Sequence, residues 1–109
     1  MRFYGIPSED RIYEIVEGIE EGQWVYEENG KKEELDAQKA REKLLELTAM
    51  VKKWKEETRS IPAGTTFFFV STPDNPQAIK VYDLSSLGCS SSLSPARWKV
   101  YKKELEGQL

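Results

Sequence analysis

A long run of helix-forming residues constrains the fold of this chain more than any other feature. Residues 31–59 are dominated by Glu, Lys, Leu, Ala, Gln and Arg, which have high helix propensities. Acidic side chains gather at the front of the run and lysines at its back, as the helix dipole favours. The run predicts one α-helix roughly 40 Å long, at about 1.5 Å per residue.

Small and apolar side chains recur along this run at alternating steps of three and four residues, a heptad pattern. They are Ala37, Ala40, Leu44, Leu47, Val51 and Trp54. Either the stripe packs on a sheet of the same chain, or it joins copies of the chain into a dimer or higher homo-oligomer. Leu45 lies beside the stripe and could widen it enough to serve both.

The segments before the run are short. Residues 1–6 and 23–28 predict two strands, and Asn29-Gly30 ends the second. Residues 8–21 carry apolar side chains at the i, i+3, i+4 and i+7 spacing of a helix. The same β-branched residues also favour a strand. We expect a helix there.

Aromatic strands follow the long run. Residues 65–71 and 78–84 predict a hairpin, because the connection at 72–77 contains two prolines that stop both strands. Three successive phenylalanines in the first strand cannot share one face. Either both faces are covered or one ring lines a pocket. Residues 85–94 predict a serine-rich loop, and residues 95–105 fit a helix or a strand.

Together these segments predict an α+β fold, in which a small antiparallel sheet packs against the one long α-helix, with one or two shorter helices. We expect a single domain over residues 1–109. Its parts are an acidic strand and helix segment at 1–30, the long helix at 31–59, and the aromatic hairpin with the C-terminal segment at 60–109.

The inventory of reactive side chains excludes many enzymes. The chain has no histidine and one cysteine, Cys89. It therefore lacks a Ser-His-Asp triad, a Cys-His pair, a zinc site of Cys and His and an intrachain disulfide. Its glutamates do not form the converging loop of a divalent-cation site. We expect a protein that is not an enzyme and uses no metal or other cofactor.

Charge is unevenly distributed. Residues 1–36 carry 11 acidic and 4 basic side chains, and residues 37–109 carry 8 acidic and 12 basic ones. The acidic front would repel duplex nucleic acid. No segment has the apolar run of a membrane span or a signal peptide. We expect a cytoplasmic protein that binds neither duplex nucleic acid nor membrane, although a small anion needs only one or two donors.

The candidate ligand site centres on Arg97. It lies between hydroxyl-bearing residues and Trp98, outside any cluster of charges. A guanidinium can hold a phosphate in a fork, and Phe68 or Trp98 could stack on a base. Asp74 and Asn75, in a turn between prolines, could present a carboxylate and an amide. The alternative is a surface arginine in an amphipathic segment and a turn explained by its own turn chemistry.

Four short segments suggest a family. They are Arg2-Phe3-Tyr4-Gly5, Arg11-Ile12-Tyr13-Glu14, Phe67-Phe68-Phe69 and Arg97-Trp98. With the order of elements, they give the chain an architecture that resembles the small phage proteins of the Thoeris anti-defence type-one family. The resemblance implies an oligomeric, non-enzymatic sponge in the host cytoplasm. Such a sponge sequesters a cyclic nucleotide immune signal, such as a cyclic ADP-ribose variant, without cleaving it.

A different function would explain the acidic front. A homodimeric protein-interaction module could use its long helix as the dimer contact and present residues 1–36 to a basic protein partner. Such a module could inhibit its partner by imitating nucleic-acid charge.

Overall fold

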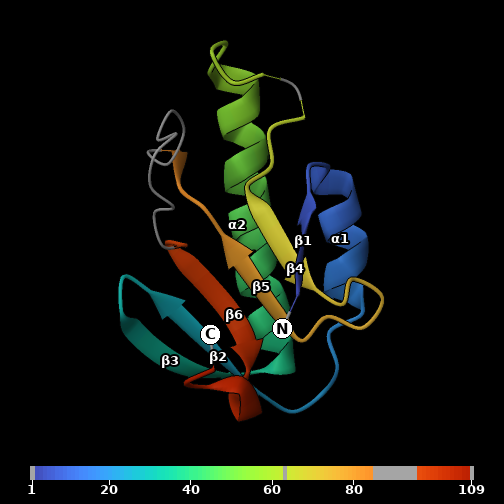
Figure 1. Cartoon of the computed structure of the whole chain (residues 1–109), viewed down its shortest axis with the longest axis vertical. Helices are drawn as coiled ribbons and strands as arrows, with labels where there is room; N and C mark the ends of the chain where they lie inside the picture. The colour runs from blue at the N-terminus through green and yellow to red at the C-terminus, as the bar shows by residue number, and fades with distance from the viewer. Residues whose placement is uncertain (1, 63, 85–95, 109) are drawn as a thin grey trace.

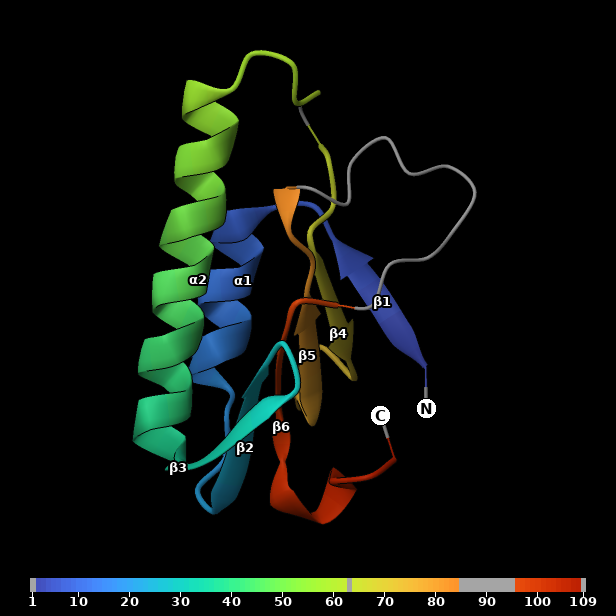
Figure 2. The ribbon, with the colours of Figure 1, turned by 90° about the vertical axis from the view of Figure 1, so that its left-hand side faces the viewer.

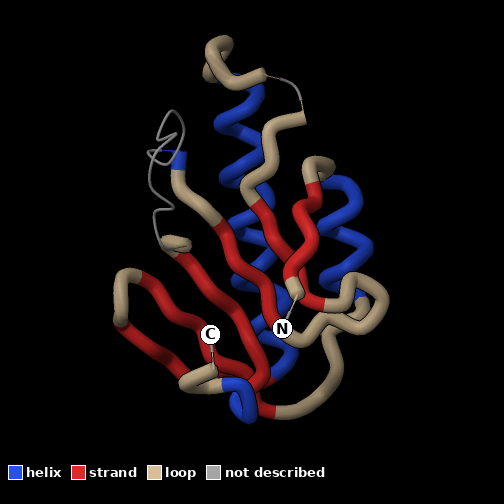
Figure 3. The backbone as a smooth tube through the Cα atoms, in the orientation of Figure 1, coloured by secondary structure: helices blue, strands red, loops and turns tan. Residues whose placement is uncertain are grey.

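A computed structural model describes residues 2–62, 64–84 and 96–108 of the chain (Figure 1). Figure 3 shows how the strands and helices follow one another along these residues. In chain order they are β1 (Phe3–Ile6), α1 (Glu9–Glu17), β2 (Gln23–Glu28), β3 (Lys31–Asp36), α2 (Ala37–Glu57), β4 (Phe68–Ser71), β5 (Ala78–Val81), β6 (Trp98–Lys102) and a short 3-10 helix, η2 (Lys103–Leu105).

The six strands form one antiparallel sheet in the order β1-β4-β5-β6-β2-β3. Both α-helices lie on the same face of this sheet (Figure 2), with α1 beside α2. The predicted α+β fold, a small antiparallel sheet against one long helix, is therefore confirmed. Neither α1 nor α2 combines the length and apolar character that crossing a bilayer requires, and the same holds for η2.

The prediction of one helix over residues 31–59 is wrong at its beginning. Residues 31–36 form β3, and α2 begins at Ala37. Asn29 and Gly30 have φ angles of 50° and 84°. These left-handed conformations are typical of a tight hairpin turn, and they bring β3 back alongside β2. The helix is therefore about 30 Å long, at about 1.5 Å per residue.

Two interactions explain why helix-forming residues adopt a strand here. Glu27 lies opposite Lys32 across β2 and β3, and opposite charges in such positions favour pairing. Asp36 then caps α2, because its carboxylate accepts a hydrogen bond of 2.8 Å from the backbone N–H of Lys39. Intrinsic helix propensity amounts to only a few tenths of a kcal/mol per residue, so pairing with a neighbouring strand outweighs it.

The helical interpretation of residues 8–21 is confirmed for residues 9–17. α1 begins after Ser8, whose hydroxyl accepts a hydrogen bond of 3.3 Å from the backbone N–H of Arg11. Ile12, Ile15 and Val16 are buried on its inner side. The helix ends at Glu17, because Gly18 follows as its C-cap.

The strand interpretation of residues 95–105 holds for the part that forms β6. Trp98 and Val100 join the core between the sheet and the helices, while Tyr101 belongs to a second buried cluster. A strand produces this alternation, because successive side chains point to opposite faces. The loop predicted for residues 85–94 lies outside the described residues.

The apolar stripe of the long helix packs on the sheet of its own chain. Its members Ala37, Ala40, Leu44, Leu47 and Val51 are buried. The ring of Trp54 lies 5.6 Å from that of Phe67. The first of the two interpretations is thus confirmed, and the stripe is not available to join copies of the chain. Leu45, which is 40% exposed, does not belong to it.

Candidate functional site

The face of the sheet that α1 and α2 leave uncovered, called the helix-free face below, carries an unusual mixture of rings and ammonium groups. Phe68 and Val81, opposite each other on β4 and β5, face the helices. The next pair along, Phe69 and Lys80, therefore faces away from them. Lys80 is in turn opposite Lys99 of β6. We call the residues Phe3, Phe69, Lys80, Tyr82 and Lys99 the aromatic-lysine face.

Two contacts involve the rings of this face: one joins Phe69 and Tyr82, and the other joins Phe3 and the ammonium of Lys80. The Phe69 and Tyr82 rings meet edge to face, with centroids 5.4 Å apart and planes at 77°. Tyr82 extends the strand pairing, because its backbone N–H donates to the carbonyl of Phe67 at 2.9 Å. On the other side, the Lys80 ammonium lies 4.4 Å from the centroid of Phe3. An ammonium over a ring face is a favourable cation–π contact.

The two lysines of the face repel each other. Like charges directly opposite on neighbouring strands destabilise a sheet. Burial and the charge of Lys99 lower the pKa of Lys80. Across the described ranges, no acidic side chain lies within ion-pair distance of either ammonium. Glu27 is opposite Lys99 on β2, but its carboxylate accepts a hydrogen bond of 3.0 Å from the hydroxyl of Tyr101.

Gly5 gives Phe69 the room that its ring needs. Gly5 lies opposite Phe69 across β1 and β4. A Cβ atom at Gly5 would come within 3.1 Å of the Phe69 ring and 3.0 Å of the Thr66 methyl group. Glycine therefore permits a close approach of ring and backbone at this position.

The C-terminal residues cover the other end of the helix-free face. Val25, Ala78 and Tyr101 form a small buried cluster there, and Phe3 and Leu105 pack against it. Burial and the carboxylate of Glu27 raise the pKa of Tyr101 to about 12. Phe3 thus marks the border between this closed end and the aromatic-lysine face.

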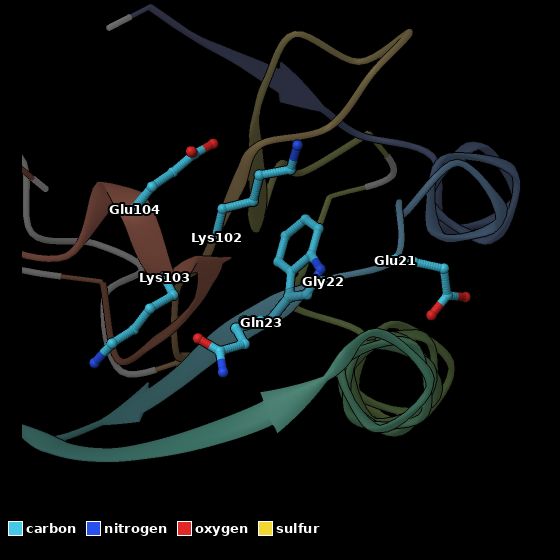
Figure 4. Close-up of a pocket in the computed structure, with 7 residues that line it drawn as sticks. Glu21, Gly22, Gln23, Lys102, Lys103 and Glu104 are labelled. Atoms are coloured by element: carbon cyan, nitrogen blue, oxygen red, sulfur yellow. The ribbon is translucent and has the colours of Figure 1, made fainter.

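A hollow at the same end of the sheet provides a contrast. Its volume is about 440 Å³ (Figure 4), and it is lined by Glu21, Gly22, Gln23, Trp24, Lys102, Lys103 and Glu104. Its lysines already have acidic partners. Lys102 lies 3.4 Å from Glu20, and Lys103 lies 2.7 Å from Glu34. This hollow therefore has less positive charge to offer an anion than the Lys80–Lys99 pair.

Arg97, the predicted anion donor, binds an acid of its own chain. Its guanidinium forms an ion pair with Asp83, and it lies 5.0 Å from the ring centroid of Trp98. The hydrogen bond to Asp83 raises the pKa of Arg97. The side chain remains 41% exposed. A phosphate at Arg97 would thus compete with Asp83 for the same donors.

The two predicted stacking residues lie in the core. Phe68 is fully buried, and Trp98 is 6% exposed with its ring centroid 6.2 Å from that of Trp54. Neither ring offers a free face to a base in this structure. Phe69, the adjacent residue, is the ring that faces away from the helices. Phe67 and Phe68 are buried in the core, whereas Phe69 is half-buried on the face that α1 and α2 leave open. The expectation that both faces are covered therefore holds for one face only.

The predicted polar turn lies at the opposite end of β5 from Arg97. Asp74 is fully exposed and lies 3.8 Å from Arg11. The backbone carbonyl of Asn75 accepts a hydrogen bond of 2.8 Å from the hydroxyl of Thr72. Because Arg97 precedes the end of β6 that pairs with Val81, the length of β5 separates it from this turn. The structure brings Arg97 and Trp98 together, but it does not bring the turn to them.

Lys80 and Lys99 were missed by the sequence analysis. The signal that could have found them is the alternation of residues 78–82 and 97–101, in which each lysine follows an apolar residue that faces the core. What sequence could not show is that β5 and β6 are neighbours, because residues 95–105 fitted a helix as well as a strand.

Comparison with known proteins places the chain beside one bacterial relative. No model of a known protein family matches the chain, and no solved structure matches it. An uncharacterized protein of Aquifex aeolicus (strain VF5) is 54% identical over 110 residues, which cover 99% of this chain and 89% of that protein. The chain therefore belongs to the same protein family as this Aquifex aeolicus protein.

Proposed function

We propose that the protein is a non-enzymatic binding protein that holds a small anionic ligand of the nucleotide class on its aromatic-lysine face. One observation carries the proposal. Lys80 and Lys99 lie opposite each other on neighbouring strands, and within the described residues neither forms an ion pair. Phe69, whose ring meets that of Tyr82, lies opposite Lys80 on its other side.

An anion would relieve the repulsion between these lysines. The repulsion costs on the order of 0.2–1 kcal/mol in a sheet. The Lys80 ammonium lies over the ring of Phe3 on β1, away from β6, so binding would draw it back toward Lys99. A phosphate held by both lysines would then replace the repulsion with two charge-assisted hydrogen bonds, which are about twice as strong as neutral ones. The lowered pKa of Lys80 supports anion binding between the lysines. Burial and Lys99 disfavour the charged form of Lys80, and an adjacent anion would favour it.

The rings suit the other half of a nucleotide. Phe69 is next to Lys80 across the β4–β5 pair, so a base on this ring would lie one strand away from a phosphate on the lysines. Stacking of a base on an aromatic side chain contributes about 1–3 kcal/mol. Edge contact with Tyr82 holds the Phe69 ring in place, which lowers the entropic cost of binding.

The resemblance to the phage nucleotide sponges is compatible with this proposal. A sponge for a cyclic ADP-ribose-type signal needs donors for phosphate and a ring for the base, and it releases its ligand unchanged. In our proposal the lysines supply these donors, while Arg97 remains bound to Asp83. Absence of cleavage is part of the proposal, and it fits a chain without histidine, the most frequent general base.

A thermal-shift panel tests the proposal. It includes cyclic di- and trinucleotides, cyclic ADP-ribose, ADP-ribose, pyrophosphate and inorganic phosphate. We expect at least one nucleotide to raise the melting temperature of the wild-type protein and to be recovered intact by mass spectrometry after heat release. The double variant Lys80→Gln/Lys99→Gln should lose this shift. Lys39→Gln/Lys53→Gln on α2 makes the same change in net charge and should keep it.

Two results would contradict the proposal. A panel without any shift would remove nucleotide binding as the function. A shift that survives in Lys80→Gln/Lys99→Gln and disappears in Arg97→Ala would place the ligand at the originally predicted site near Arg97 instead.

A further inference from the structure

The two edges of the sheet differ in charge. At one edge, β3 has five charged residues among its six, namely Lys31, Lys32, Glu33, Glu34 and Asp36. At the other edge, β1 has none: its sequence is Phe-Tyr-Gly-Ile. Tyr4 is 46% exposed, and Gly5 is exposed as well. The chain therefore protects one edge of its sheet with charge and leaves the other edge neutral.

An edge strand presents unpaired backbone N–H and C=O groups that can bind another strand. Charged side chains on an edge oppose such pairing, as on β3. Among the described residues, β4 is the one strand that pairs with β1, so the outer side of β1 keeps its backbone groups free. Tyr4 adds a large ring beside these groups.

We propose that β1 pairs in antiparallel orientation with β1 of a second copy of this chain. A second copy fits this edge because it brings an equally neutral strand, so no like charges come to face each other. When β1 pairs with β1 of a second copy, a two-fold axis relates the two chains and both β1 edges are used up. The assembly therefore stops at a dimer. The charged β3 edge then remains at both ends of a continuous sheet and resists further addition.

Symmetry restricts the register of this pairing. A two-fold axis perpendicular to the sheet keeps the helices of both copies on the same face. Opposed residues of an antiparallel pair point to the same face of the sheet. Odd-numbered residues of one β1 must therefore lie opposite odd-numbered residues of the other β1, and even-numbered residues opposite even-numbered ones. Tyr4 opposite Tyr4 of the second copy satisfies this rule and covers the exposed ring. The two aromatic-lysine faces would then lie on one side of the sheet. The proposal itself does not depend on ligand binding.

Light scattering and a cysteine cross-link test the dimer. At tens of micromolar, the wild-type protein should have twice the mass of the 12.6 kDa chain. Directly opposed residues have Cα atoms about 4.5–5.5 Å apart, which a disulfide can bridge. The variant Tyr4→Cys, made with Cys89→Ser to remove the native thiol, should form a covalent dimer under mild oxidation. Glu33→Cys with Cys89→Ser, on the other edge, should remain uncross-linked.

A second pair of variants tests the role of charge. Tyr4→Lys places two ammonium groups opposite each other and should convert the dimer to a monomer with unchanged circular dichroism. Glu33→Lys on the β3 edge should stay dimeric. A wild-type protein that is monomeric at this concentration overturns the proposal. So does a dimer that persists in Tyr4→Lys and fails to cross-link through Tyr4→Cys, because its interface would then lie elsewhere.

Discussion

The two faces of the sheet come from the same strands but hold different chemistry. On the helix side, Phe68, Val81 and Trp98 lie in register across β4, β5 and β6 and are buried. One residue along, Phe69, Lys80 and Lys99 lie in register on the other side. Burial of apolar surface makes the first row a source of stability. The second row retains a like-charged pair that opposes stability.

The largest expected difference between the faces concerns adjacent phenylalanines. Phe68→Ala should lower the free energy of unfolding by about 3–5 kcal/mol, because it leaves a cavity in the core. Phe69→Ala should cost roughly 1–2 kcal/mol, since its half-buried ring can be replaced by solvent. Urea denaturation of both variants measures the difference. Equal costs would show that the helix-free face is as closely packed as the core.

Alkaline pH should weaken the closed end of the helix-free face. The pKa of Tyr101 is about 12 in the folded chain and 10.0 unperturbed. A raised pKa gives stability that is fully present below pH 10 and is lost as the pH rises toward 12. The loss is up to about 3 kcal/mol.

Urea denaturation at pH 9 and at pH 11.5 compares the wild-type protein with Tyr101→Phe. The variant should lose less stability between these two pH values, because it lacks the ionising hydroxyl. Tyr101→Phe should still lose some stability between these pH values, because burial and Glu28 also raise the pKa of Tyr26. An equal loss in both proteins would mean that the Tyr101–Glu27 hydrogen bond does not contribute.

The close approach of Gly5 and Phe69 predicts a smaller effect. Gly5→Ala should cost about 1–2 kcal/mol, because the new methyl group meets the Phe69 ring and the Thr66 methyl group. In the background of Phe69→Ala and Thr66→Ser, the same substitution should cost much less. A double-mutant analysis of unfolding free energies measures this coupling. Additive costs would mean that other contacts determine the need for glycine.

Removal of one repelling lysine should have the smallest effect. Lys80→Gln should change the free energy of unfolding by only a few tenths of a kcal/mol at low salt, with stabilisation as the expected sign. Loss of the cation–π contact with Phe3 opposes this gain. The gain should shrink in 1 M salt, since salt screens the repulsion. A clear destabilisation at low salt would show that the contact with Phe3 outweighs the repulsion by Lys99.

Much of the fold could be predicted from local patterns. The spacing of Ile12, Ile15 and Val16 indicates α1, and the prolines of residues 72–77 indicate the β4–β5 hairpin. Residues 31–36 could not be assigned in this way. Their composition favours a helix, but Asn29 and Gly30 turn the chain so that these residues pair with β2. A strand partner is a non-local interaction, and propensity does not include it.

The candidate site was harder to predict than the fold. The ring that faces away from α1 and α2 is Phe69 and not Phe68, because a shift of one residue along a strand changes the face. The ring of Trp98 is covered by the helix side of the fold, where it meets Trp54. Arg97 already binds an acid of its own chain, because Asp83, 14 residues away, accepts a hydrogen bond from it. Each of these outcomes depends on which segments become neighbours.

Some properties of this protein follow from its amino-acid order and composition. A count of reactive groups is enough to show that histidine is absent. Local periodicity is enough to locate α1 and the apolar stripe of α2. Other properties exist only once the chain has folded. The pairing of Lys80 with Lys99, the neutral edge at β1 and the burial of Phe68 arise because hydrogen bonding between strands joins segments far apart in the sequence. Contacts of this kind set the charge and exposure of each side chain, and no local pattern encodes them.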